Sequence, residues 1–91
     1  MNDKILLKVL LPANQQTYEF RVSFDLSVAQ GAQLMARIVA AQDAARYCAP
    51  QECSLMFCEG PSSGELLEEG VVFGFLAASN LLVDGTLLAL M

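Results

Sequence analysis

The chain opens with two stretches in which apolar and polar residues alternate. In residues 4–11, one face is made by Ile5, Leu7, Val9 and Leu11. Lys4 and Lys8 mark the opposite face as the one that meets solvent. Residues 17–23 repeat the period of two and place Tyr18, Phe20 and Val22 inward. Because turn-forming residues at 12–16 separate the two stretches, they predict an N-terminal hairpin.

The pattern changes to helical spacing after Ser27. This serine can act as N-cap, and Gln30 stands three residues later, where a capping box places its second member. Residues with helical spacing follow at Val28, Gly31, Ala32, Met35, Ile38 and Val39. An alanine-rich continuation over 40–46 prolongs the pattern, and Pro50 is expected to end it. The sequence therefore predicts one amphipathic helix that packs on the sheet.

The second half of the chain contains shorter elements. We expect a third strand at 54–58, a short fourth strand at 65–67, a helical turn at 75–80 and a last strand at 86–91. The dipeptide Asp84-Gly85 supplies the reversal into the last strand. A right-handed crossover after a hairpin favours pairing of the last strand beside the first. The sequence predicts one α+β domain over 1–91, a β-grasp of order ββαββ with a mixed sheet of four to five strands on one main helix.

Composition and charge narrow the classes of function. The 91 residues are 55% hydrophobic and 16% charged, which is enough apolar area for one modest core. Ten acidic residues against five basic ones disfavour binding to a nucleic-acid backbone, which needs clustered Lys and Arg. No apolar run reaches the roughly 20 residues of a membrane span, and the N-terminus lacks the pattern of a signal peptide. We therefore expect a cytoplasmic protein that is not inserted in a membrane, and the acidic balance mildly favours a partner with a basic surface.

The residue types needed for catalysis or metal binding are sparse. The chain has no histidine, and Cys48, Cys53 and Cys58 are spaced five apart rather than as a close metal-binding pair. We interpret them as buried or half-buried reduced thiols. The acidic cluster of Glu65, Glu68 and Glu69 is interpreted as a solvated turn, and the loop 60–64 lacks the lysine of a phosphate-binding loop. The sequence thus predicts no enzyme, no catalytic residue, no metal and no cofactor.

Three local matches carry a resemblance to a known superfamily. Leu55-Met56-Phe57 with Gly60 resembles the third strand of ubiquitin, and 65–70 resembles its short fourth strand and acidic turn. The segment from Leu76 to Leu87 resembles its leucine, short helix, turn and final strand. The chain resembles the ubiquitin-like superfamily over nearly its whole length, and most of all the tailless YukD-like proteins associated with bacterial type VII secretion; a weaker likeness links it to the ubiquitin-like lobes of FERM domains. The apolar stretch Gly70 to Phe75 departs from the ubiquitin pattern as an insertion.

The resemblance implies a binding function. Ubiquitin and the sulfur-carrier proteins of thiamine and molybdopterin synthesis are charged at a C-terminal Gly-Gly, whereas this sequence ends in Leu90-Met91. We therefore expect a non-enzymatic, unconjugated interaction module with a protein partner, in the first place a component of the secretion machinery, or a homodimer. The alternative is a degenerate sulfur-carrier-like accessory subunit of an adenylating or synthase enzyme.

The predicted binding residues lie on the sheet face opposite the helix. If Leu55 faces the helix, alternation turns Met56 away from it. If Leu87 and Ala89 likewise point inward, Leu88 and Leu90 point outward. Together with the first strand, this predicts a protein-binding patch of Met56, Leu88, Leu90, Leu6 and Leu10. The open alternative is that the C-terminal tail or residues 71–73 fold over this face.

Overall fold

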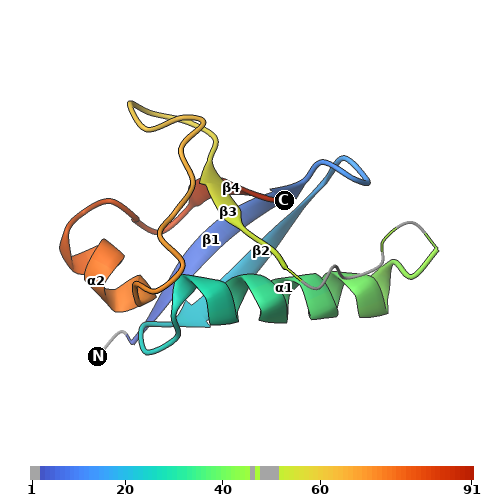
Figure 1. The fold of residues 1–91 in the computed structure, drawn as a ribbon, viewed down its shortest axis with the longest axis horizontal. Helices are drawn as coiled ribbons and strands as arrows, with labels where there is room; N and C mark the ends of the chain where they lie inside the picture. Colours follow the sequence, from blue (N-terminus) through green and yellow to red (C-terminus); the bar gives the residue numbers. More distant parts are fainter. Residues whose placement is uncertain (1–2, 46, 48–51) are drawn as a thin grey trace.

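A four-stranded sheet and one long helix form the two layers of the protein. The computed structural model describes residues 3–45, 47 and 52–91. Its elements are β1 (Lys4–Leu11), β2 (Gln16–Ser23), α1 (Val28–Gln42), β3 (Leu55–Phe57), α2 (Phe73–Ala78) and β4 (Thr86–Leu90). The sheet order is β2-β1-β4-β3, in which β1 and β4 are parallel and the other two pairs antiparallel (Figure 1). The predicted position of the last strand beside the first is confirmed.

Helix α1 begins where the capping pattern predicted. The Gln30 backbone N–H donates to Ser27 Oγ at 3.2 Å, and the Ser27 N–H donates to Gln30 Oε1 at 3.0 Å, which completes the capping box. The N–H groups of Val28 and Ala29 donate to backbone carbonyls of residues 71 and 69. The first turn of α1 is therefore satisfied by protein groups, which tie the segment before α2 to the start of the helix.

The far end of α1 is held by a small polar cluster. The helix ends at Gln42, short of the predicted continuation to residue 46, which lies outside the described residues. Asp43, the C-cap, accepts a hydrogen bond of 2.8 Å from Asn14 Nδ2, which also donates to the Tyr18 hydroxyl at 2.9 Å. Asn14 Oδ1 accepts from the Gln16 N–H at 3.0 Å. This buried asparagine joins the β1–β2 turn to the end of the helix.

The core lies between α1 and the inner face of the sheet. It contains, among others, Leu7, Val9, Val28, Met35, Val39, Leu55, Phe73, Leu76, Leu82, Leu88 and Leu90. Tyr18 and Phe20 pack against this cluster and Val22 lies within it, as the alternation in β2 predicted. In the part of the chain that the structure describes, no helix is long and apolar enough to cross a membrane.

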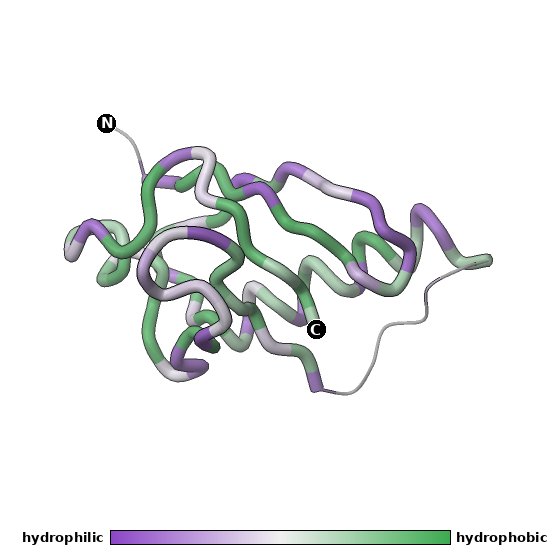
Figure 2. Tube along the Cα trace, turned by 90° about the horizontal axis from the view of Figure 1, so that it is seen from above, coloured by the Kyte–Doolittle hydropathy of each residue, from purple (hydrophilic) through white to green (hydrophobic). Residues whose placement is uncertain are grey.

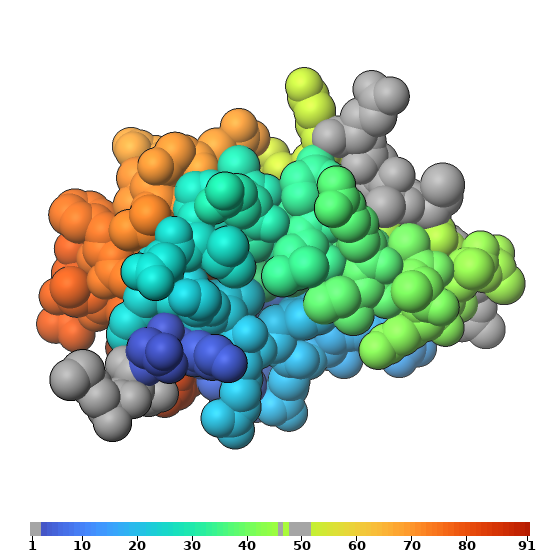
Figure 3. Space-filling view, turned by 90° about the horizontal axis from the view of Figure 1, so that it is seen from below, coloured from blue at the N-terminus to red at the C-terminus, as the bar shows by residue number. Residues whose placement is uncertain are grey.

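Helix α2 starts earlier than predicted, at Phe73 instead of residue 75. Phe73 is fully buried and its ring lies against Gly31 of α1, so the stretch we treated as an insertion supplies a core side chain. Figure 3 shows the α2 segment in orange beside the N-terminal half of α1. The backbone N–H groups of Phe73 and Gly74 donate to the carbonyls of Leu26 and Phe24, which anchors the start of α2.

The predicted fourth strand at 65–67 is reduced to a single bridge. Met56 pairs with Leu66, and three backbone hydrogen bonds link residues 64–67 to Leu55 and Phe57. The segment thus runs beside β3 without the length of a regular strand, because Leu67 turns into the core while the following residues leave for the start of α1.

Candidate functional site

The sheet face opposite α1 carries an apolar row that crosses three strands. In β1, Leu10 pairs with Ala89 of β4, Ala89 pairs with Met56 of β3, and Met56 pairs with Leu66. Residues in register point to the same side of a sheet, so these four side chains share one face. Helix α1 lies on the other side of the sheet, as the ribbon and the tube show (Figures 1 and 2). Ala89 is almost fully buried because the larger Leu10 and Met56 flank it.

Charged residues border this row on the side of β2. Lys8 pairs with Glu19 in one direction and with Leu87 in the other, and Leu6 pairs with Arg21. Lys4, Lys8 and Arg21 are three of the five basic residues of the chain, and all three share this face. The open sheet face therefore combines half-buried apolar side chains with a local excess of positive charge, although the whole chain has a net charge of −5.

The structure divides the predicted patch between the open face and the core. Met56, Leu6 and Leu10 are half-buried on the open sheet face. Leu88 and Leu90 are 0% and 2% exposed and belong to the core, so the predicted orientation of β4 is wrong. The register explains the reversal, because Leu88 pairs with Val9, whose side chain faces α1. The residue that sequence reasoning missed is Leu87, which takes the outward place beside Lys8.

The segments that could have covered this face lie elsewhere. Phe73 packs beneath α1, on the other side of the sheet, and Val71 accepts the backbone hydrogen bond of Val28 at the helix start. Met91 exchanges two backbone hydrogen bonds with Ser54 and therefore continues the β3–β4 pairing. Residues 71–73 and the described C-terminal end thus leave the sheet face open.

A second apolar surface surrounds α2. The side chains of Leu66 and Phe75 are each 60% exposed and that of Leu81 is 52% exposed. All three line one hollow of about 280 Å³ together with Phe57, Ser62, Glu65, Leu67, Glu68, Val71 and Leu76. Sequence reasoning missed this surface because Phe75 was assigned to the insertion. Its signal was the spacing of Phe73 and Leu76, which predicts an inward face for α2 and leaves Phe75 outside.

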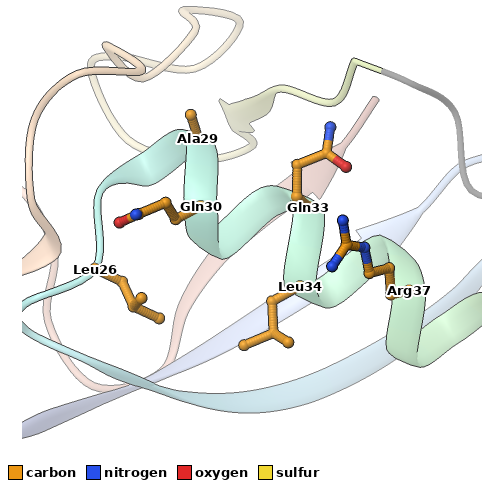
Figure 4. Close-up of a pocket in the computed structure, with 6 residues that line it drawn as sticks. All are labelled: Leu26, Ala29, Gln30, Gln33, Leu34 and Arg37. Carbon is orange, nitrogen blue, oxygen red and sulfur yellow. The ribbon is translucent and has the colours of Figure 1, made fainter.

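Another hollow, of about 460 Å³, lies on the outer surface of α1. Its apolar lining comes mainly from the side chains of Leu26 and Leu34, and its polar lining from those of Gln30, Gln33 and Arg37 (Figure 4). Gln30 is already used by the capping box. The residues form a shallow depression along one helix and bring together no nucleophile with a base, so the hollow offers a contact surface instead of a reaction site.

The described thiols have the properties of structural cysteines. Cys53 is buried and Cys58 is half-buried, and Cys48 lies outside the described residues. Burial raises the pKa of the Cys53 thiol; burial, and then the negative charge of Glu59, raise the pKa of Cys58. A raised pKa keeps these sulfurs protonated at neutral pH, which makes them poor nucleophiles. Among residues 3–45, 47 and 52–91, no three Cys, Asp or Glu side chains are grouped to hold a metal ion.

Comparison with known proteins finds similarity in structure but not in sequence. No protein-family model matches the chain, and no curated protein sequence matches it. Among solved structures, a chain of a toluene 4-monooxygenase HD complex with the inhibitor 4-bromobenzoate is similar with a TM-score of 0.63 and 16% identity, over 96% of this chain and 95% of that one.

Two further solved structures carry ubiquitin or ubiquitin-like domains. Ubiquitin from Caldiarchaeum subterraneum has a TM-score of 0.58 and 16% identity, over 96% of this chain and 90% of that one. The N-terminal ubiquitin-like domain of the 4931431F19Rik protein has a TM-score of 0.59 and 15% identity, over 100% and 76%. Identities this low establish the fold alone. Together with the mixed sheet on one main helix, they show that the chain has the ubiquitin-like β-grasp fold.

Proposed function

We propose that this protein is a non-enzymatic interaction module that binds a protein partner through its open sheet face. The observation that carries the proposal is the outward apolar row of Leu10, Ala89, Met56 and Leu66, on a face that α1 leaves uncovered. Soluble monomers rarely keep contiguous apolar surface in water unless it serves binding. Leu87 and Leu6 extend the surface toward β2, and Leu87 takes the place of the misassigned Leu88 and Leu90.

The charges at this face refine the expected partner. Lys4, Lys8 and Arg21 give the border of the patch a positive excess, so the complementary surface carries carboxylates around an apolar centre. This differs from the preference for a basic partner that the net charge suggested. The charges within one face affect the orientation of a bound partner more than the total charge of the chain does, because salt screens the charges that lie farther away.

Binding measurements with single substitutions test the patch. We would recover partners by crosslinked affinity purification, and then measure binding of the purified partner by calorimetry. Met56→Glu and Leu87→Glu each place a charge in the apolar contact and should weaken binding by at least about tenfold, or ~1.4 kcal/mol. Gln42→Glu, which adds the same charge at the exposed last residue of α1, is the matched control. Unchanged affinity in both patch variants would overturn this assignment of the surface.

A component of the type VII secretion machinery is the first partner to test. The likeness of the sequence to YukD-like proteins supports this choice. A homodimer through the same face is the other form of the proposal, and sedimentation of the purified protein separates the two. A dimer that Met56→Glu dissolves would favour self-association.

A second candidate function is that of an accessory component in an enzyme assembly. The likeness to a chain of a toluene 4-monooxygenase complex, which spans nearly the full length of both chains, favours it. In this form the protein would contribute a contact surface while other subunits supply the chemistry. Recovery of the subunits of an enzyme in the same purification, with loss of their activity when this protein is removed, would support this candidate over the secretion partner.

A further inference from the structure

The hollow beside α2 continues into a second one and forms a groove. The first hollow and its neighbour, each of about 280 Å³, share Phe57, Ser62 and Leu81. One wall is the loop between β3 and residue 68, and the other runs from α2 into β4 through Leu81 and Thr86. Phe57, at the end of β3, contributes to both hollows. The α2 groove, as we call this surface, is thus an elongated depression that two segments distant in sequence enclose.

The groove is apolar inside and acidic at its border. Leu66, Phe75 and Leu81 line it and are each more than half exposed to solvent, whereas Leu67 and Leu76 also line it but are buried. Glu65 and Glu68 line the first hollow and Glu59 lines the second. Within the described part of the chain, neither hollow has a Lys or Arg among its lining residues. A bound group therefore meets hydrophobic contacts flanked by three carboxylates.

The packing of α2 on the core does not explain why Phe75 is exposed. Helix α2 buries Phe73 and Leu76, which secure it to the core, and Gly74 lies close to Phe24. Phe75 projects from the remaining side of this short helix into the groove. A single exposed aromatic residue is ordinary, but here it shares one depression with two exposed leucines, and such clusters mark interaction surfaces.

We propose that the α2 groove binds a protein segment in which an apolar side chain is flanked by lysine or arginine. The two hollows lie one after the other along the groove, an arrangement that suits successive side chains of an extended chain. The apolar anchor enters between Phe75 and Leu81, and the basic groups reach Glu65, Glu68 or Glu59. The aliphatic stems of Lys and Arg cover additional apolar wall, and an Arg guanidinium can lie on the Phe75 ring.

The shape of the groove disfavours a second copy of this chain as the occupant. Three of the five basic residues of a second copy, Lys4, Lys8 and Arg21, lie on its open sheet face, and Arg37 lies beside Leu34 on the outer surface of α1. A sheet face and the side of a regular helix are both broader than a single extended segment, so neither fits the depression as well as such a segment does. The α2 groove therefore serves a different ligand from the sheet face, and the two surfaces have opposite local charge.

Selection from a displayed library of random dodecapeptides tests the chemistry directly. We expect enriched peptides that carry an apolar residue with Lys or Arg within two positions, and their affinity should fall as salt rises. Titration of the labelled protein with one enriched peptide, followed by amide chemical shifts, should perturb 57–68 and 75–82. Enrichment no greater than on an unrelated acidic protein, or peptides without basic residues, would overturn the proposal.

Matched variants separate the groove from general effects of charge and hydrophobicity. Phe75→Ser and the double variant Glu65→Lys/Glu68→Lys should each lower peptide affinity by at least about tenfold. Val83→Ser, which removes an exposed apolar residue outside the groove, and Asp25→Lys/Glu52→Lys, which reverses two exposed charges that line neither hollow, should leave it unchanged. Equal losses in the control variants would contradict the assignment to this groove.

Two further outcomes separate this inference from the proposed function. Met56→Glu should abolish binding at the sheet face and leave the peptide affinity of the groove intact, so either surface can fail alone. Sedimentation of the wild-type protein tests the other occupant. A concentration-dependent dimer that Phe75→Ser dissolves would show that a second copy fills the groove, and would overturn the proposed basic segment.

Discussion

Gly31 is the residue on which the packing of the two helices depends. A Cβ atom at this position would overlap the ring of Phe73, which is itself fully buried. A glycine within a helix normally costs up to about 1 kcal/mol relative to alanine because it has more conformational freedom to lose. Here the absence of a side chain lets α2 approach α1, and this contact brings Phe75 to the edge of the groove.

Gly31→Ala should destabilise the protein by about 1–2 kcal/mol, because overpacking of the Phe73 ring outweighs the gain in helix propensity. Chemical denaturation measures the change. Gly70→Ala is the matched control, since nothing lies within 4 Å of the Cβ it would add. In the background of Phe73→Leu, the same Gly31→Ala change should cost less. Equal costs in both backgrounds would show that the ring is not the cause.

The two described cysteines yield a prediction on pH. Burial, the first cause at both sites, raises each thiol pKa, so the folded state holds these protons more tightly than the unfolded state. Their contribution to stability is present below the thiol pKa of the unfolded chain and is lost as the pH rises through the folded value. At mildly alkaline pH, iodoacetamide should alkylate Cys53 and Cys58 more slowly in the native protein than in urea.

Site-resolved mass spectrometry measures these alkylation rates. Glu59→Gln should speed the reaction of Cys58, whose pKa the neighbouring carboxylate raises in addition to burial, and should leave Cys53 unchanged. Native rates equal to those in urea would mean that the thiols are not protected by the fold.

At the scale of elements, strand β4 decides which leucines form the core. Its sequence Thr86-Leu87-Leu88-Ala89-Leu90 is apolar at almost every position, so alternation cannot identify the buried face. The register of β4 with β1 determines which face is buried, and the turn before β4 fixes this register. Asp84 Oδ1 accepts the Leu6 N–H at 3.0 Å and the Gly85 N–H donates to the Leu6 carbonyl at 2.8 Å. These two bonds set Leu88 opposite Val9.

Adjacent leucines in β4 should therefore respond differently to the same substitution. Leu88→Ala removes a fully buried side chain and should cost about 2–5 kcal/mol, whereas Leu87→Ala, on the half-buried outer face, should cost clearly less. Thermal or urea denaturation of the two variants measures the difference. A larger loss for Leu87→Ala would mean that the strand has the opposite orientation.

The sequence was sufficient where local chemistry determines structure. The capping box at Ser27 and Gln30, the alternation in β1 and β2, and the turn at Asp84-Gly85 each specify an element from neighbouring residues. The sequence was insufficient where the orientation of a strand or the burial of a side chain depends on contacts with residues far away along the chain. The outward faces of β1 and β3 were therefore predicted, whereas the orientation of β4 depends on its register with β1. In the same way, the role of Phe73 depends on the space at Gly31.

At the scale of the whole molecule, charge is separated between two surfaces. Lys4, Lys8 and Arg21 lie on the open sheet face, and Glu59, Glu65 and Glu68 line the α2 groove. Leu66 adjoins both, because it pairs with Met56 and also lines the groove. The two surfaces should therefore favour different ligands, an acidic surface at the sheet face and a basic segment at the groove.

Both surfaces rest on one continuous core, which predicts cooperative unfolding. The buried cluster joins Leu7 of β1, Met35 of α1, Leu55 of β3, Leu76 of α2 and Leu88 of β4. Each of these elements is too short to be stable without the others, so loss of one should release the rest. In urea, the loss of helical circular dichroism and the exposure of the Cys53 thiol should share one midpoint, with a slope of about 1 kcal/mol per molar urea.

Gly31→Ala would test this cooperativity, because it acts at the α1–α2 contact, whereas the Cys53 thiol reports on the segment before β3. If the core is one unit, the variant lowers the midpoint of both signals equally. If the α2 region opens independently, Gly31→Ala would leave the Cys53 midpoint unchanged while peptide binding at the groove fails first. The groove would then be a locally unfolding surface, and the affinity of its ligand would include the cost of ordering it.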